Sequence, residues 1–443
     1  MTNKKSKRRD PDRASFRKHP VEYVMRLFAD VRAGEAATVL LLSLNVFLLL
    51  TAYYLLKVAR EPLILEGGKA EVKTFASAGQ AVTLVLVSWA YGWLAHHVGR
   101  MKLIAIVSIF FVGNLVLFFV LGEAGVPLGI PFYLWVGVYS LTILTQFWAF
   151  AADIYTDAQG KRLFPIIGIG ASVGSVLGAF LPKLMIELGP FVLMLVAAGL
   201  LLAALAVTFV VHRRERELGK EDEEDHHDQP LAGANGWKLL FADNYLLFIG
   251  ALALIINCVN TNGEYIFDRT LLATAEQKAA QSGLEVSQYI ESVKSTYFLW
   301  VNVVGSALQL FVVSRVIKYV GVKRALFVMP LISLVGYSGL TLAPVLLLTL
   351  VVKVGENSLD YSLQNTARNA LWLVVPRDAK YKAKQITDTV MVRLGDVLAA
   401  GVVWVGTKMA LGTRAFVIAN IVLAVAWLAV VFYLGRTHEE RKA

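Results

Sequence analysis

Long apolar segments alternate with short polar loops along most of the chain. A helix that crosses a bilayer needs about 20 mostly apolar residues. Twelve segments meet this requirement and are predicted to span a membrane: 36–57, 72–96, 103–121, 130–154, 163–186, 190–211, 243–267, 294–316, 325–342, 345–373, 384–408 and 413–434. Composition agrees, because 57% of the 443 residues are hydrophobic and only 17% are charged. The pattern therefore predicts an all-α polytopic membrane protein with twelve transmembrane helices.

The two halves of the chain carry matching basic loops. Residues 95–102 read AHHVGRMK and residues 317–324 read IKYVGVKR, about half a chain length apart. A second pair, DAQGKR at 157–162 and DAKYK at 378–382, follows at nearly the same offset. Two pseudo-symmetric six-helix halves are typical of secondary transporters of the major-facilitator type, whose substrate site lies between the halves.

Charge along the chain predicts its domains and orientation. We expect a basic tail at 1–35, a six-helix half at 36–211, a charged linker at 212–242, a second half at 243–435 and a C-terminal tail at 436–443. Lys and Arg gather in the tail and in alternate loops, which predicts that both termini are cytoplasmic. The expected location is the bacterial inner (plasma) membrane, as a multi-pass protein. The net charge of +10 reflects this bias and does not indicate nucleic-acid binding. The tail is expected to lie against anionic lipid.

No cofactor, metal site or catalytic set is expected, so the chain is predicted not to be an enzyme. The only cysteine, Cys258, excludes an intrachain disulfide. Residues 168–174 (GIGASVG) follow no strand, so they do not indicate a dinucleotide loop. Gly170, Gly174 and Gly178 instead lie four residues apart and predict a close helix–helix approach. A monomer is expected.

Charges inside predicted spans indicate a cavity or a partner, because a charge facing lipid is costly. At the end of the first span, Lys57 and Glu61 are four residues apart, Arg60 lies beside them, and Pro62 is expected to stop the helix. Two interpretations remain open for this group. The side chains snorkel at the outer mouth, or Lys57 and Arg60 present cations to an anionic substrate.

A polar stripe runs along segment 345–373. Glu356, Asp360, Gln364 and Arg368 follow one another at four-residue steps. Such a stripe must line a cavity between the helices or pair with another helix.

Segments 384–408 and 243–267 also carry charges. Arg393 and Asp396 are three residues apart and can form an ion pair within one helix. Glu264 can carry a proton or pair with a cation such as Arg393. The sequence does not separate these roles.

Residues 92–102 resemble the signature loop of the major facilitator superfamily, Gly-x-Leu-Ala-Asp-x-x-Gly-Arg-x-Lys. Gly92, Gly99 and Arg100 match this pattern, whereas His96 replaces the usual Asp. The resemblance implies a gating loop, and the matching loop of the second half contributes Lys323 and Arg324.

Three further stretches resemble the non-mitochondrial ATP/ADP translocases, the nucleotide transporters of plastids and intracellular bacteria. They are REPLI at 60–64 with KAE at 69–71, FWAFA at 147–151 with KRLFPIIGIGA at 161–171, and YSL at 361–363 with YKAK at 381–384. The chain is identified as a distant member of that family. The resemblance implies substrate-linked cations at Arg60 and at Lys382 or Lys384, and it places Val136 and Asn260 where the family has Glu.

Together these features predict a secondary transporter that works by alternating access on an anionic solute, with a nucleotide as the best guess, by exchange or uptake. Tyr53, Tyr54, Trp148, Tyr361 and Trp372 are candidates for stacking on a base. The expected substrate-binding residues are Lys57, Arg60, Asn260, Glu264, Asp360, Gln364, Arg368, Lys382, Lys384, Asp388 and Arg393. One alternative is a proton-coupled exporter of lipophilic or cationic compounds with Glu264 and Asp360 as proton sites. Another is a non-transporting membrane sensor or scaffold on the same fold.

Overall fold

The computed structural model describes residues 35–155, 157–217, 236–282, 285–376 and 383–442. The first half is a helical bundle in which each chain reversal needs only a few residues. Its elements are α3 (Ala36–His97), α4 (Arg100–Glu123), α5 (Gly129–Ile154), α6 (Asp157–Leu184), the short 3₁₀ helix η1 (Ile186–Leu188) and α7 (Gly189–Glu217).

The second half contains the same kind of bundle, interrupted by π-helical turns. It begins with α8 (Gly236–Ala242), α9 (Asn244–Ser282), α10 (Val286–Leu308), the π turn η2 (Gln309–Val313), α11 (Ser314–Tyr319) and α12 (Val322–Leu342). It continues with α13 (Leu346–Leu359), the π turn η3 (Asp360–Gln364), α14 (Asn365–Leu371), η4 (Trp372–Val374), α15 (Lys384–Ile386), the π turn η6 (Thr387–Met391), α16 (Val392–Lys408) and α17 (Thr413–Lys442).

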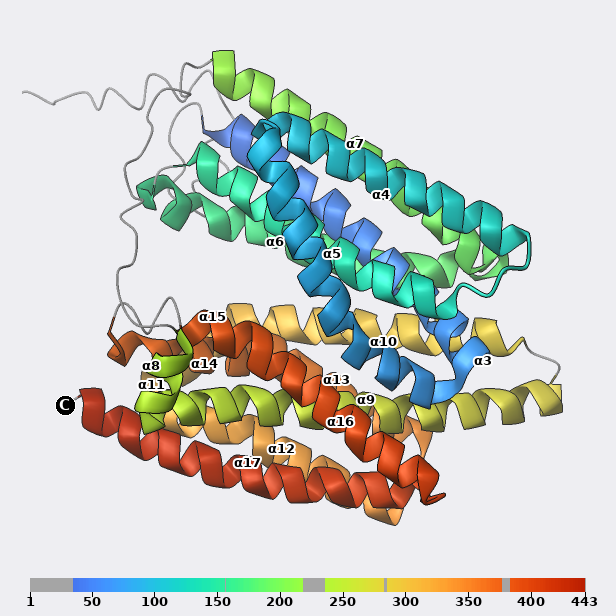
Figure 1. Cartoon of the computed structure of the whole chain (residues 1–443), viewed down its shortest axis with the longest axis vertical. Helices are drawn as coiled ribbons and strands as arrows, with labels where there is room; N and C mark the ends of the chain where they lie inside the picture. The colour runs from blue at the N-terminus through green and yellow to red at the C-terminus, as the bar shows by residue number, and fades with distance from the viewer. Residues whose placement is uncertain (1–34, 156, 218–235, 283–284, 377–382, 443) are drawn as a thin grey trace, which may run out of the picture.

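The structure confirms the predicted fold class. Within the described residues, 10 helices are long and apolar enough to cross a membrane. The two other predicted spans are also helical, as the second arm of α3 up to His97 and as the run from α13 to η4. Figure 1 shows the N-terminal half above the C-terminal half, with the helices of both running in the same general direction.

The prediction that Pro62 stops the first helix is wrong. The first spanning helix continues to Glu66, and the helical geometry breaks at Lys69 (φ 61°, ψ 175°). Pro62 is buried, and Gly129 of α5 lies so close that an added Cβ would be 2.4 Å from the carbonyl oxygen of Leu63. Close packing of neighbouring helices is what allows a membrane helix to continue through a proline.

The glycine stripe of α6 packs against α3 as the sequence predicted. A Cβ added to Gly170, Gly174 or Gly178 would lie 2.4 Å from the carbonyl oxygen of Ser43, Phe47 or Thr51, respectively. Only a residue without a side chain permits this backbone approach.

The two halves meet at the end of the bundle that is remote from the linker. There Ser295 of α10 donates to the carbonyl of Ala179 of α6 at 2.5 Å, and the Tyr265 hydroxyl of α9 donates to Glu71 of α3 at 3.1 Å. Tyr54, Phe267, Phe298 and their neighbours form a buried apolar cluster at the same boundary. Among the described residues, no hydrogen bond or ion pair joins the halves at the linker end.

Candidate functional site

A chain of buried charges crosses the boundary between the halves. We define the ion cluster by its members from four helices: Arg60, Glu61 and Lys73 of α3, Glu264 and Asp268 of α9, Lys294 of α10, and Lys353 and Glu356 of α13. The break at Lys69 turns α3 back on itself, so that Glu61 and Lys73, on its two arms, face each other. The kink therefore creates the N-terminal side of the cluster.

The centre of the ion cluster is a four-membered group of two lysines and two carboxylates. Lys73 Nζ lies 2.6 Å from Glu61 Oε2 and 2.7 Å from Asp268 Oδ2. Lys294 Nζ lies 3.1 Å from the same Glu61 oxygen and also bonds to Asp268 Oδ1. Glu61 and Lys294 are completely buried. Each lysine therefore connects a carboxylate of the N-terminal half to one of the C-terminal half.

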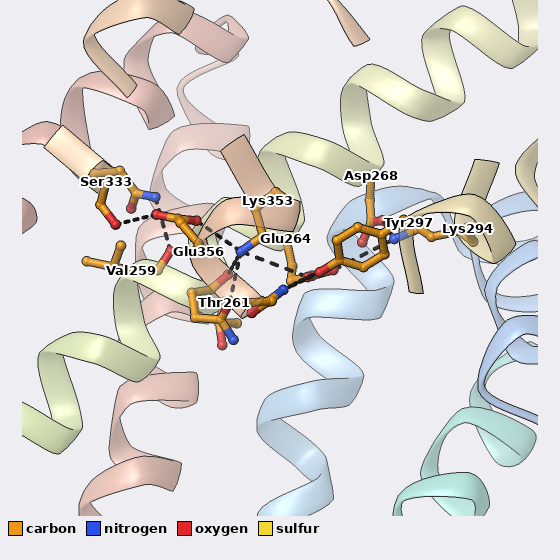
Figure 2. A network of polar contacts seen from close by, with 12 residues as sticks. Val259, Thr261, Glu264, Asp268, Lys294, Tyr297, Ser333, Lys353 and Glu356 are labelled. Carbon is orange, nitrogen blue, oxygen red and sulfur yellow. Dashed lines mark hydrogen bonds and ion pairs between the residues drawn. The ribbon is translucent and has the colours of Figure 1, made fainter. Parts of the chain in front are cut away.

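Glu264 lies beside this group and contacts the lysines more loosely. Its Oε2 is 3.8 Å from Lys73 Nζ and 3.7 Å from Lys294 Nζ, and its Oε1 is 3.9 Å from Lys353 Nζ. Its closest partner is the Tyr297 hydroxyl, which donates to Oε1 at 2.7 Å. Figure 2 shows Glu264 between Lys353 on one side and Tyr297 and Lys294 on the other.

The remaining members of the ion cluster, Lys353 and Glu356, lie on α13 in the C-terminal half. Lys353 Nζ lies 3.3 Å from Glu356 Oε2 and donates to Asn260 Oδ1 at 2.8 Å. Glu356 also accepts a hydrogen bond from Ser333 at 2.5 Å (Figure 2) and one from Tyr337 at 2.8 Å, and both donors lie on α12. The polar stripe of α13 thus pairs Glu356 with another helix, which is one of the two alternatives that the sequence left open.

The charges of this region do not cancel. The ion cluster and the adjacent Lys57 together hold five cations (Lys57, Arg60, Lys73, Lys294, Lys353) against four carboxylates (Glu61, Glu264, Asp268, Glu356), a formal net charge of +1. Buried charges are tolerated when each has an opposite charge and further hydrogen bonds. An excess cation at such a buried position therefore attracts an anion.

A cavity of about 180 Å³ lies against the ion cluster, between the halves. Lys57, Arg60 and Tyr133 line its N-terminal side, whereas Asn260 and Tyr361 belong to its C-terminal side. Its wall also contains Glu61, Lys73, Glu264 and Asp268. The cavity thus sits where both halves contribute polar side chains.

Lys57 is the excess cation of the cavity. The residue is 9% exposed, and its ammonium lies 4.4 Å from the ring centroid of Phe298, 5.2 Å from that of Tyr54 and 5.7 Å from that of Tyr53. No carboxylate of the described residues lies within ion-pair distance of it. Aromatic faces attract a cation without neutralising its charge. The aromatic rings therefore hold the Lys57 side chain at the cavity wall.

Two arginines complete the positive lining. The Arg60 guanidinium lies 4.5 Å from the ring centroid of Tyr133, and its Nε is 3.3 Å from Glu61 Oε1. Arg393 of α16 lies on the opposite wall and pairs with Asp396 at 3.0 Å, as its spacing predicted. Arg393 does not pair with Glu264.

This arrangement, a polar cavity between two helical halves, is accompanied by a family match over most of the chain. The profile described as Major Facilitator Superfamily matches residues 36–367. The chain belongs to that superfamily. No curated protein matches the chain, so the finer resemblance to the ATP/ADP translocases stays a prediction.

Solved transporter structures share the fold at low sequence identity. The nucleoside transporter NupG is 13% identical, with a TM-score of 0.65 over 89% of this chain and 98% of that one. The POT family transporter PepTSo is 11% identical, with a TM-score of 0.65 over 91% and 98%. A bacterial homologue of the human lysosomal transporter Spinster, inward-facing and unoccupied, is 14% identical, with a TM-score of 0.61 over 92% and 98%. At these identities the likeness shows the fold alone.

The structure brings five of the predicted substrate-binding residues together at the cavity. They are Lys57, Arg60, Asn260, Glu264 and Arg393. Of the predicted aromatic residues, Tyr53 and Tyr54 surround Lys57 and Tyr361 lines the cavity, but Trp148 and Trp372 do not line it.

The other predicted residues lie away from the cavity in this conformation. Asp360, Gln364 and Arg368 do not line it, although Asp360 Oδ1 and both amide atoms of Gln364 are buried without a hydrogen-bond partner among the described residues. Lys384 and Asp388 pair with each other at 3.0 Å. Lys382 lies outside the described residues.

The loops predicted to act in gating contact helix ends within their own halves. Arg100, directly after Gly99, lies 2.7 Å from Asp153 at the end of α5. Lys323 lies 2.7 Å from Glu439 near the end of α17, and its neighbour Arg324 is exposed. Gly321 adopts φ 86°, a conformation that favours glycine. Gly92 lies within α3.

Sequence reasoning missed three of the four lysines that organise the site. Lys73 and Lys294 stand at the beginnings of predicted spans, where a lysine is usually explained as an interfacial anchor. Lys353 lies inside a predicted span, three residues before Glu356. That spacing was the available signal, because it permits an ion pair on one helix face.

Proposed function

We propose that this protein is a secondary transporter that moves a small anionic solute across the membrane by alternating access. The observation that carries the proposal is Lys57, a buried cation on the cavity wall that has aromatic neighbours and no carboxylate partner among the described residues. Arg60 adds a second positive group on the same wall.

Electrostatics favours an anion over a cation in this cavity. Every carboxylate that lines it has a basic partner: Glu61, Glu264 and Asp268 face lysines, and Asp396 faces Arg393. A cationic substrate would have to displace one of these partners. An anion next to Lys57 would instead complete a neutral arrangement, in a region where the low dielectric strengthens the attraction.

Nucleotides are the first substrate class to test. Tyr133, Tyr265 and Tyr361 line the cavity and offer ring surfaces for a base, while Lys57 and Arg60 offer charge for phosphate oxygens. The sequence resemblance to nucleotide translocases supports the same class, by exchange or uptake.

Alternating access in this proposal starts from a conformation that is closed at the end remote from the linker. The contacts between the halves lie there, at the ion cluster and at Ser295–Ala179. We assign the linker end to the cytoplasm of a bacterial cell, since the basic loops gather at that end. Labelling of a cysteine placed in the linker from outside intact cells should fail, and efficient labelling there would contradict this orientation.

A thermal-shift screen of the purified protein tests the substrate class. The ligands are nucleotides, organic phosphates and drug-like cations, and we expect stabilisation by anions only. Lys57→Gln should weaken binding of the best anion by about 1–4 kcal/mol, as expected for one charge near an anion at an effective dielectric near 20. Lys57→Arg keeps the charge and should retain part of the affinity.

Two results would overturn the proposal. Stabilisation by cations with no response to anions would favour a proton-coupled exporter. Binding of an anion without any flux into proteoliposomes would favour a sensor or scaffold.

A further inference from the structure

The side-chain amide of Asn260, on the cavity wall, is held in one orientation. Lys353 Nζ donates to Asn260 Oδ1 at 2.8 Å and to the Asn260 backbone carbonyl at 3.3 Å. An ammonium group has three donors and no acceptor, so the amide oxygen, and not the nitrogen, must face Lys353. Lys353 is 1% exposed and does not line the cavity. Asn260 Nδ2 therefore points away from Lys353, and it donates to no acceptor among the described residues.

The other two asparagines of the cavity wall use their amide nitrogens elsewhere. Asn257 Nδ2 donates to a backbone carbonyl of α16 and to Asp396 Oδ1, each at 2.7 Å. Asn357 Nδ2 donates to the Tyr297 hydroxyl. Within the described part of the chain, Asn260 is therefore the asparagine of this wall whose N–H groups remain available to a ligand.

The position of Lys353 is fixed in turn by its own partners. Its Nζ lies 3.3 Å from Glu356 Oε2, and Glu356 accepts hydrogen bonds from Ser333 and Tyr337 of α12. Each of these four residues is at most 1% exposed. This buried chain of contacts therefore holds the Asn260 amide as well as balancing the charges of α13.

We propose that Asn260 is a specificity-determining residue whose amide nitrogen donates a hydrogen bond to the substrate, and that Lys353 is the residue that positions it. An anion held by Lys57 and Arg60 on the N-terminal wall would present the rest of the molecule to the C-terminal wall. A fixed donor there favours an acceptor oxygen and disfavours an amino group in the same place. This inference rests on the proposed function and narrows its substrate to an anion with a separate, uncharged hydrogen-bond acceptor.

Two pairs of anions test the inference, because the members of each pair differ mainly in an acceptor oxygen against a donor amino group. One pair is inosine monophosphate and adenosine monophosphate, and the other is para-nitrobenzoate and para-aminobenzoate. Binding of each anion to the purified wild-type protein is measured by calorimetry. We expect the acceptor member of a pair to bind about five- to thirty-fold more tightly, because its partner leaves two donors facing each other.

Asn260→Asp keeps an oxygen for Lys353 and replaces the N–H donor by an acceptor oxygen. The added charge repels both members of a pair alike, so the ratio of their affinities is the readout, and this ratio should reverse in favour of the amino member. Asn260→Leu removes both polar atoms and should abolish the preference. For any other anion that the thermal-shift screen identifies, Asn260→Leu should weaken binding about five- to thirty-fold, and normal binding would overturn the inference.

Lys353 is tested through its effect on the same ratio. Lys353→Met combined with Glu356→Gln removes the ion pair without leaving Glu356 charged and unpaired. The released Asn260 amide can then turn either its oxygen or its nitrogen to the ligand, so the preference should disappear. Lys353→Arg retains a cation with donors only and should keep the preference. A lysine that only stabilised the fold would not change the ratio.

Asn262→Leu is the matched control on the same helix. Asn262 Nδ2 donates to Asn420 Oδ1 at 2.7 Å and to the Phe416 carbonyl at 3.1 Å, and the residue does not line the cavity. This variant should lower the stability of the protein and leave the affinity ratio of each pair unchanged.

The outcomes separate this inference from the proposed function. If the wild-type protein binds no anion at all, the proposed function fails. If it binds the anions of a pair with equal affinity, only the role of Asn260 is overturned. The same holds if Asn260→Asp keeps the wild-type ratio, or if Asn262→Leu changes the ratio as much as Asn260→Leu does. Should the Asn260 variants not fold, the wild-type ratio still decides the matter.

Discussion

Lys73 of α3 and Asp268 of α9 lie 2.7 Å apart, Nζ to Oδ2, across the boundary between the two halves of the bundle. Lys294 of α10 bonds to the same Asp268 and to Glu61 of α3. In the proposed alternating-access cycle, the end at which these side chains meet must open. The ion cluster therefore both closes that end and forms one wall of the cavity.

Removing the buried lysine of this group should destabilise the protein strongly. Lys294 is completely buried, so Lys294→Met leaves Glu61 and Asp268 with one lysine between them. We expect a loss of about 3–5 kcal/mol in the free energy of unfolding, measured by denaturant titration in detergent. Lys294→Met combined with Asp268→Asn should recover part of that loss.

The control for this experiment is Lys323→Met, which breaks an exposed ion pair with Glu439 and should cost at most about 1 kcal/mol. Equal stability of Lys294→Met and Lys323→Met would show that the buried group does not hold the halves together.

The close approach of α3 and α6 gives a second stability prediction. A Cβ at Gly174 would lie 2.4 Å from the Phe47 carbonyl oxygen, so Gly174→Ala should lower the free energy of unfolding by about 1–3 kcal/mol. Gly168→Ala on the same helix meets nothing within 4 Å and should be neutral or slightly stabilising. The prediction is wrong if the two variants unfold at the same denaturant concentration.

Arg100 tests the role of the loop after α3. Its ion pair with Asp153 is exposed, so Arg100→Ala should change stability by less than about 1 kcal/mol. We expect it to slow transport while leaving substrate affinity within about a few-fold, measured by initial uptake rates and by equilibrium binding. Arg436→Ala removes a comparably exposed pair with Glu440 at the end of α17 and should leave the rate unchanged. A collapse of affinity at normal cycling rate would exclude a gating role for Arg100.

The positions of two cations predict which variant affects binding more. Lys57 lines the cavity and Arg368 does not. We therefore expect Arg368→Gln to weaken anion binding by less than Lys57→Gln does, in calorimetric titrations of both variants at the same pH. A larger loss for Arg368→Gln would mean that Arg368 contacts the substrate, as the stripe on its helix first suggested.

Hydrophobic periodicity was sufficient to predict the fold, because membrane helices need long apolar segments whatever their tertiary contacts. The predicted end of the first helix at Pro62 was wrong, since local propensity does not reveal that α5 packs against α3 at Leu63. The role in helix packing of one glycine stripe was predictable, because small residues four apart on an apolar helix allow a second helix to approach closely. The stripe is Gly170, Gly174 and Gly178.

The site was predicted less completely than the fold. Lys57, Arg60, Asn260, Glu264 and Arg393 were expected to bind substrate; they line the cavity, and their role in binding stays a prediction. The partners of Glu264 were not predictable, because Lys73, Lys294 and Lys353 come from three helices whose relative placement depends on the kink at Lys69.

The measurement that most directly tests the account is uptake into proteoliposomes that contain the purified protein. Nucleotides, organic phosphates and lipophilic cations are offered to the wild type and to Lys57→Gln. The account predicts saturable uptake of an anionic solute, and high salt should weaken binding of that solute. Lys57→Gln should lose most of the uptake at equal protein content. Saturable uptake of cations, or anion uptake that Lys57→Gln leaves unchanged, would contradict it.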